Sequence, residues 1–137
     1  MTQLPAQKMV LLMVDVDRFA EVNRLHGHRE GDALLYELSE LMLLNLRQDD
    51  LICRYAADRF AVLLPDTGVD KGKSIAAELS RAVQHFAYKH KTSGETLYQT
   101  ISIGLADWQG EPSDLLIKRA NQALANAKSG SGFGEVA

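Results

Sequence analysis

The sequence predicts an α+β fold in which helices pack against a mainly antiparallel central sheet. A continuous apolar run at 9–14 has the composition of a strand that is buried on both faces of a sheet. Two shorter apolar runs, 51–55 and 60–64, are separated by four residues, which is the pattern of an antiparallel hairpin. Stretches with helical spacing of apolar residues follow both features. The expected order is therefore β-αα-ββ-α-β-α.

The first half of the chain is predicted to contain two helices between the first strand and the hairpin. A short helix covers 19–25, because Phe19, Val22 and Leu25 recur at helical spacing. The glycine-containing segment 26–31 is expected to be a loop that separates it from a longer helix. That second helix carries one apolar stripe, formed by Leu34, Leu38, Leu41 and Met42.

The second half is predicted to contain the hairpin, a helix, a strand and a final helix. The hairpin tip is expected at 56–59, and a helix with an inward apolar face is expected from 69 to about 88. The polar segment 89–95 is interpreted as a surface loop. The partly alternating segment 97–106 is interpreted as one strand. Pro112 and Ser113 open the last helix, whose end lies at Lys128.

Length and composition predict one domain. The chain has 137 residues with 46% hydrophobic and 24% charged composition, enough to bury a single core. We expect an N-terminal flank at 1–8, the domain at 9–128 and a flexible glycine-rich tail at 129–137. Cys53 lies in an apolar run and is expected to be a buried structural thiol.

Charge and hydropathy exclude two classes of partner. With a net charge of −3, the chain lacks the excess of basic residues typical of a general nucleic-acid binder. Any nucleotide partner is therefore expected to be a small molecule. No apolar stretch approaches the length of a membrane span. A cytoplasmic protein, or the cytoplasmic part of a longer membrane-anchored one, is expected.

Carboxylates gather at two predicted chain reversals. Asp15 and Asp17 leave the first strand, and Asp58 lies at the hairpin tip. In the predicted topology these side chains can meet and form an oxygen-rich site suited to Mg²⁺. The alternative from the residues alone is that each is solvated or caps the following helix.

The segments 14–23 and 27–35 carry the patterns D-x-D-x-F-x-x-x-N and G-H-x-x-G-D-x-x-L. They resemble the GGDEF domain of diguanylate cyclases, and further similarity continues through the hairpin to 120–124. The resemblance covers nearly the whole chain. It implies the nucleotide cyclase, palm-like GGDEF fold and a place in cyclic di-GMP signalling.

The resemblance also implies roles for individual residues. Asp15, the carbonyl of Val16 and Asp58 match the metal ligands of the family. Asn23 and Asp32 match the pair that hydrogen-bonds guanine. Lys128 matches a lysine that contacts the triphosphate, although a cation at a helix end is favourable without any ligand.

The signature loop departs from the family pattern. It consists of Ala56, Ala57, Asp58, Arg59 and Phe60. The two alanines replace glycines that let backbone approach the nucleotide closely. Arg59 replaces an acidic residue, and we expect it to pair with Asp15, Asp17 or Asp58 and to compete with Mg²⁺. The arginine that the family carries shortly after Lys128 is absent.

A second site of the family is retained in sequence. Arg47 and Asp50 fit the R-x-x-D motif that binds cyclic di-GMP as an inhibitor, at the usual distance before the signature loop. The alternative is an ordinary polar helix end.

Three functions are open at this point. The favoured one is a non-catalytic regulatory module that binds cyclic di-GMP at Arg47 and Asp50, or GTP at the former active site. The second is an active diguanylate cyclase that condenses two GTP molecules with Mg²⁺, and the third is a structural dimerisation domain. Mg²⁺ is expected only with GTP. The resemblance implies fused or partner signalling domains and leaves a homodimer open.

Overall fold

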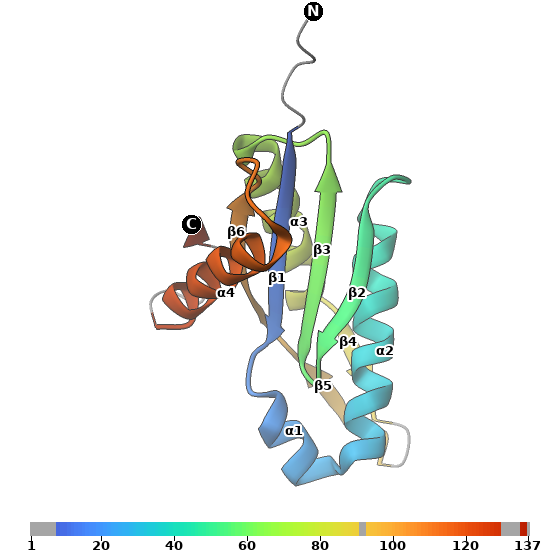
Figure 1. The fold of residues 1–137 in the computed structure, drawn as a ribbon. Helices are drawn as coiled ribbons and strands as arrows, with labels where there is room; N and C mark the ends of the chain where they lie inside the picture. Colours follow the sequence, from blue (N-terminus) through green and yellow to red (C-terminus); the bar gives the residue numbers. More distant parts are fainter. Residues whose placement is uncertain (1–7, 91–92, 130–134, 137) are drawn as a thin grey trace, which may run out of the picture.

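The computed structural model describes residues 8–90, 93–129 and 135–136, and its centre is a five-stranded sheet in the order β2-β3-β1-β6-β7 (Figure 1). The strands of this sheet are β1 (Met9–Val16), β2 (Leu51–Ala56), β3 (Arg59–Pro65), β6 (Ile101–Asp107) and β7 (Glu135–Val136). Neighbouring strands are antiparallel except β6 and β7, which are parallel. The predicted α+β class and mainly antiparallel sheet are confirmed.

The middle strand β1 owes its place to its apolar composition. It pairs with β3 on one edge and with β6 on the other, so all of its backbone lies inside the sheet. Every residue from Val10 to Val16 is buried. β1 therefore places the carboxylate of Asp15, near its C-terminal end, in the interior of the protein.

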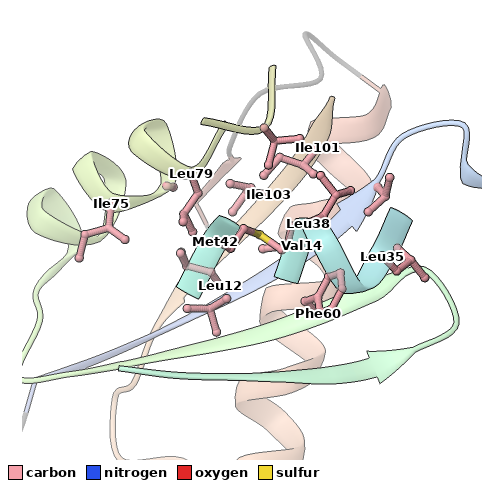
Figure 2. Packing of buried hydrophobic residues seen from close by; sticks show 14 of the residues in the cluster. Leu12, Val14, Leu35, Leu38, Met42, Phe60, Ile75, Leu79, Ile101 and Ile103 are labelled. Carbon is pink, nitrogen blue, oxygen red and sulfur yellow. The ribbon is translucent and has the colours of Figure 1, made fainter. Parts of the chain in front are cut away.

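Helices cover both faces of the sheet, which explains why β1 is apolar on both sides. The helices are α1 (Phe19–His26), α2 (His28–Leu44), α3 (Val69–Gln84) and α4 (Ser113–Ser129). Val10, Leu12 and Val14 belong to the larger core, together with buried residues of α1, α2 and α3. Figure 2 shows Leu12 and Val14 within this cluster. Leu11 and Met13 point into a smaller core, under α4. The stripe predicted on α2 contributes to the larger core, with Leu34, Leu38 and Met42 buried and Leu41 partly buried.

Three predicted boundaries are wrong. The loop expected at 26–31 is a single residue, Gly27, whose φ of 88° permits a sharp corner between α1 and α2. The helix expected to reach residue 88 ends at Gln84. The strand expected at 97–106 is divided between β5 (Thr96–Tyr98) and the start of β6 at Ile101.

The segment after α3 folds back as a small hairpin instead of continuing the helix. β4 (Ala87–Lys89) pairs with β5, so Lys89, the first residue of the expected surface loop, belongs to a strand. Residues 91 and 92 of that loop lie outside the described residues. Tyr88 is buried, and its hydroxyl donates to Glu30 Oε1 at 2.7 Å. Burial, reinforced by Glu30, raises the pKa of the Tyr88 hydroxyl. A tertiary contact, which local periodicity does not reveal, therefore decides the conformation here.

The prediction of a buried Cys53 is also wrong, because Cys53 is exposed. It lies on β2, which is one of the two edge strands of the five-stranded sheet. The expected flexible tail at 129–137 falls mostly outside the described residues. Ser129 belongs to α4, and Glu135–Val136 form β7. Within the described ranges no helix has the length and apolarity needed to cross a membrane.

The packing of α4 on β6 depends on Gly104. A Cβ at this position would lie 2.2 Å from the backbone nitrogen of Leu124 and 2.4 Å from the carbonyl oxygen of Ala120. We expect Gly104→Ala to lower the free energy of unfolding by about 3 kcal/mol or more, because helix backbone cannot move aside locally. Urea denaturation measures this. Gly68→Ala is the matched control, since its new methyl group would meet only the flexible Lys8 side chain at 3.8 Å, and it should change stability little.

Candidate functional site

Strand pairing brings the end of β1 against the hairpin tip. Asp15 is the register partner of Arg59, and the backbone N–H of Val16 donates to the carbonyl oxygen of Asp58 at 3.1 Å. The tip itself is a tight turn at Ala57 and Asp58. The residues that the sequence analysis assigned to a metal site, Asp15, Val16 and Asp58, therefore lie together.

The carboxylate of Asp15 is buried and is approached by two cations. Its Oδ2 accepts a hydrogen bond from Lys128 Nζ at 2.6 Å and lies 3.7 Å from the Arg59 guanidinium. Its Oδ1 has no hydrogen-bond partner among the described residues. Burial raises the pKa of Asp15, the hydrogen bond from Lys128 lowers it, and the nearby Asp58 carboxylate raises it, leaving a net increase. The prediction that Arg59 pairs with one of these aspartates is confirmed for Asp15.

Arg59 is anchored by more than charge. Its Nη1 donates to Asn121 Oδ1 at 3.0 Å, so the guanidinium bridges the hairpin tip and α4. Asn121 was not among the predicted site residues. The available signal was its position seven residues, or about two helical turns, before Lys128, which puts both side chains on one face of α4.

Both carboxylate oxygens of Asp17 accept hydrogen bonds from hydroxyl groups near the start of β6. Its Oδ1 accepts from Ser102 Oγ and its Oδ2 from Thr100 Oγ1, both at 2.7 Å. Lys128 Nζ lies 3.7 Å from Oδ1. Asp17 therefore fastens the β1–α1 connection to the start of β6.

This donor set does not fit a catalytic divalent-metal centre. One oxygen of Asp15 is taken by Lys128, and Arg59 places a fixed positive charge beside it. Among the described residues there is no group of three or more His, Cys, Asp or Glu side chains that could hold a metal ion. Mg²⁺ requires oxygen ligands in near-octahedral geometry, and an adjacent guanidinium opposes its charge.

The predicted guanine-binding pair lies at the junction of α1 and α2. Asn23 is on α1, and its Oδ1 is buried without a hydrogen-bond partner among the described residues. This oxygen lies so close to Gly31 that a Cβ there would be 1.9 Å away, so the glycine creates the space that the amide fills. Asp32, on the next position of α2, is 70% exposed at its side chain. The arrangement leaves a buried acceptor and an exposed carboxylate near each other.

Arg54 links this region to the hairpin tip and was also absent from the predicted site. Its Nη2 donates to the carbonyl oxygen of Ala57 at 2.6 Å and lies 3.7 Å from Asp32 Oδ1. Both side chains of the ion pair are largely exposed, so the pair itself adds little to stability. The contact to Ala57 holds the tip in its turn.

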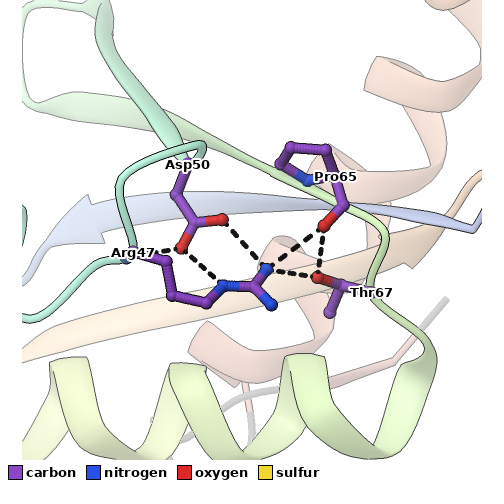
Figure 3. A network of polar contacts seen from close by, with 4 residues as sticks. All are labelled: Arg47, Asp50, Pro65 and Thr67. Carbon is purple, nitrogen blue, oxygen red and sulfur yellow. Dashed lines mark hydrogen bonds and ion pairs between the residues drawn. The ribbon is translucent and has the colours of Figure 1, made fainter.

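Arg47 and Asp50 form a bidentate pair at the opposite end of β2 (Figure 3). Arg47 Nε donates to Asp50 Oδ2 at 3.1 Å, and Nη2 donates to Oδ1 at 2.9 Å and to the carbonyl oxygen of Pro65 at 3.2 Å. The same Nη2 lies against Thr67 Oγ1. The Asp50 side chain is fully buried, whereas that of Arg47 is 43% exposed. Hydrogen bonding to Asp50 raises the pKa of Arg47.

The two regions are well separated. Strand β2 runs between them, and its six residues span roughly 20 Å at the usual rise of a strand. The structure therefore brings Asp15, Val16, Asp58 and Lys128 into one cluster. It leaves Arg47 and Asp50 at a second place.

The ion pair between Lys128 and Asp15 predicts a pH-dependent stability. We expect Lys128→Met to lower the free energy of unfolding at pH 7.5 by about 1 to 3 kcal/mol, because a buried carboxylate loses its closest cation. Without Lys128 the pKa of Asp15 rises further above its unfolded value. The charged Asp15 carboxylate then lowers the free energy of unfolding, and this loss grows as pH rises from the unfolded pKa to the folded pKa of Asp15. Below the unfolded pKa the carboxyl is protonated in both states and the loss disappears.

Urea denaturation at pH 7.5 and pH 5 measures this difference, which should shrink at pH 5. Lys118→Met is the matched control, since Lys118 is an exposed lysine of the same helix. An equal loss at both pH values would contradict the assigned role of Asp15.

Comparison with known proteins identifies similar domains. The family described as "Diguanylate cyclase, GGDEF domain" matches residues 2–132. The chain is 38% identical over 125 residues to diguanylate cyclase DgcM of Escherichia coli, covering 90% of this chain and 29% of DgcM. It is 34% identical over 120 residues to the response regulator PleD of Caulobacter vibrioides, covering 86% of this chain and 26% of PleD. The chain thus spans less than a third of the length of these relatives.

Solved structures agree with the fold. Diguanylate cyclase SiaD of Pseudomonas aeruginosa, determined in complex with its activator SiaC, superposes with a TM-score of 0.89 at 33% identity, covering 95% of this chain and 50% of that one. The GGDEF domain of DgcB of Caulobacter crescentus, determined in complex with c-di-GMP, superposes with a TM-score of 0.89 at 22% identity, covering 95% and 78% of the two chains. By its sequence match over nearly its full length, the chain belongs to the diguanylate cyclase GGDEF-domain family.

Proposed function

We propose that this GGDEF domain is a non-catalytic regulatory module that binds cyclic di-GMP through Arg47 and Asp50. The observation that carries the proposal is the pairing of the Asp15 carboxylate with Lys128 and Arg59. Cyclase chemistry in this family uses Mg²⁺, and here two resident cations compete for the carboxylate that would bind it.

Several features of the hairpin tip support the loss of catalysis. Phosphoryl transfer depends on metal ions and cations that neutralise the triphosphate at defined positions. Arg59 is fixed by Asn121 as well as by Asp15, so it is not free to leave when a nucleotide arrives. The methyl groups of Ala56 and Ala57 add bulk where the family has glycine.

The geometry of Arg47 supports ligand binding at the second site. Its guanidinium is oriented by Asp50, whose buried carboxylate has no access to solvent. An oriented guanidinium with part of its surface exposed is suited to bidentate recognition of phosphate or of a guanine edge. The protein therefore avoids the entropic cost of ordering this side chain when a ligand binds.

A second candidate function is retention of GTP at the former active site. The unpartnered Oδ1 of Asn23 and the exposed carboxylate of Asp32 favour it. In that case Mg²⁺ would accompany GTP, and no cofactor is proposed otherwise. In either case the signal would pass to further domains in the cytoplasm, because this chain corresponds to only part of its longer relatives.

The first test of the proposal is isothermal titration of the domain with cyclic di-GMP. We expect saturable binding to the unmodified domain and at least tenfold weaker binding to Arg47→Lys, which keeps the charge near Asp50 but loses the bidentate fork. Thermal denaturation establishes that the variant is folded. Equal affinities of the two proteins would overturn the assignment of Arg47.

The second test addresses catalysis. GTP and Mg²⁺ should yield no cyclic di-GMP with the unmodified domain, as measured by chromatography of the nucleotides. The combined variant Ala56→Gly, Ala57→Gly and Arg59→Glu removes the competing cation and restores the family pattern of the tip, and we expect it to gain Mg²⁺ affinity.

Synthesis by the unmodified domain would contradict the non-catalytic proposal. Failure of the combined variant to gain Mg²⁺ affinity would show that Arg59 is not what excludes the metal. Lys118→Met serves as a control that leaves the tip unchanged.

A further inference from the structure

Strand β2 is an edge of the sheet that no other described strand covers. Five of its six residues are exposed, including Leu51 at 61% and Tyr55 at 47% of their surface. It contains no proline and no lysine, and its single charged residue is Arg54. Natural proteins normally protect such an edge with several charges, proline or a bulge. Here the pairing with β3 is irregular only between Arg54 and Ala56, so the regular apolar part of the edge remains available for pairing.

An apolar stripe of α2 runs beside this edge. Tyr36 is 66% exposed and Leu43 is 48% exposed, and they are seven residues apart on one face of the helix. A groove of about 300 Å³ lies between α2 and β2, lined in part by Tyr36, Leu43, Ile52 and Cys53. The unpaired backbone and the exposed side chains therefore form one continuous surface.

From these features we infer that β2 pairs antiparallel with β2 of a second copy of this chain, around a two-fold axis at Cys53. Edge pairing between identical surfaces is isologous, so each exposed group must meet a suitable partner on the same surface. The α2 stripes of the two copies would then lie side by side on one face of the joint sheet, with Tyr36 of one copy near Leu43 of the other.

Charge selects the register of this pairing. A two-fold axis perpendicular to the sheet keeps each side chain on its own face. One residue of β2 must therefore lie directly opposite the same residue of the second copy, and the axis is named by that residue. An axis at Arg54 would set two guanidinium groups opposite each other, which is unfavourable. An axis at Cys53 sets Arg54 opposite Ile52, and Leu51 opposite Tyr55, while pairing most of the strand.

The same register provides charge complementarity on the helical face. Arg54 and Glu40 both line the groove between α2 and β2. Across the axis, Arg54 of one copy would approach Glu40 of the other, and the symmetric contact would repeat. The two Glu40 carboxylates in the middle of the stripes would thus be neutralised.

This dimer would separate the two former active sites. The hairpin tip lies at the C-terminal end of β2, so antiparallel pairing places the two tips at opposite ends of the joint sheet. No nucleotide could bridge them across this interface. The inferred dimer would therefore assemble domains without a nucleotide shared between the two tips.

Sedimentation analysis of the full chain over a range of concentrations tests the inference. We expect a monomer–dimer equilibrium that weakens at least tenfold in Tyr36→Lys and in Glu40→Arg. Leu115→Lys, a matched change of an exposed α4 residue outside the surface, should leave it unchanged. A monomer at all concentrations, or a dimer insensitive to both α2 substitutions, would overturn the inference.

Cross-linking tests the register directly. A short bis-maleimide should link two unmodified chains through Cys53. In a Cys53→Ser background, a mixture of Leu51→Cys and Tyr55→Cys proteins should cross-link efficiently, whereas each protein alone should not. Efficient linkage of either protein with itself would contradict a two-fold axis at Cys53.

Discussion

The buried carboxylate of Asp15 is the constraint on which the candidate site depends. A charge cannot be removed from water without a partner, and β1 places this one inside the sheet because apolar residues precede it. Lys128 supplies the nearest compensation from α4, and Arg59 supplies a second from the tip. The last helix, the middle strand and the hairpin are therefore joined at one anion. Any change at this point alters stability and the site together.

Because of this coupling, one substitution in the signature loop would have a large chemical effect. An acidic residue at position 59 would add to the negative charge around Asp15 and favour a divalent cation. Arg59 instead adds a positive charge, so the charge of the Asp15 carboxylate is balanced by residues of the domain itself. The residue that would exclude Mg²⁺ is thus also a residue that stabilises the folded tip. The proposed loss of catalysis would therefore be compatible with retention of the fold, because both would follow from the same contact.

The sequence predicts the fold and part of the site correctly where a strong local pattern agrees with the family resemblance. The apolar run of β1, the stripe of α2 and the pairing of Arg59 with Asp15 are all confirmed. It failed where a long-range contact decides the outcome. The burial of Tyr88 depends on Glu30, which is 58 residues away, and the exposure of Cys53 depends on the position of β2 at the sheet edge. Arg54 was missed because a single polar residue on a strand gives no periodic signal, and Asn121 was missed because its only signal was its spacing of seven residues before Lys128.

If a ligand binds at Arg47 as proposed, the contacts of this residue would connect it to the rest of the domain. Arg47 lies in the connection between α2 and β2, and it contacts Pro65 and Thr67, where β3 leads into α3. A ligand that competes for this guanidinium would weaken its contacts to the residue before β2 and to the residues at the end of β3. Among the described strands β2 pairs only with β3, so one ladder of backbone hydrogen bonds holds it in the sheet. The hairpin would then connect the proposed site at Arg47 with the tip that carries Arg59, without any requirement for catalysis.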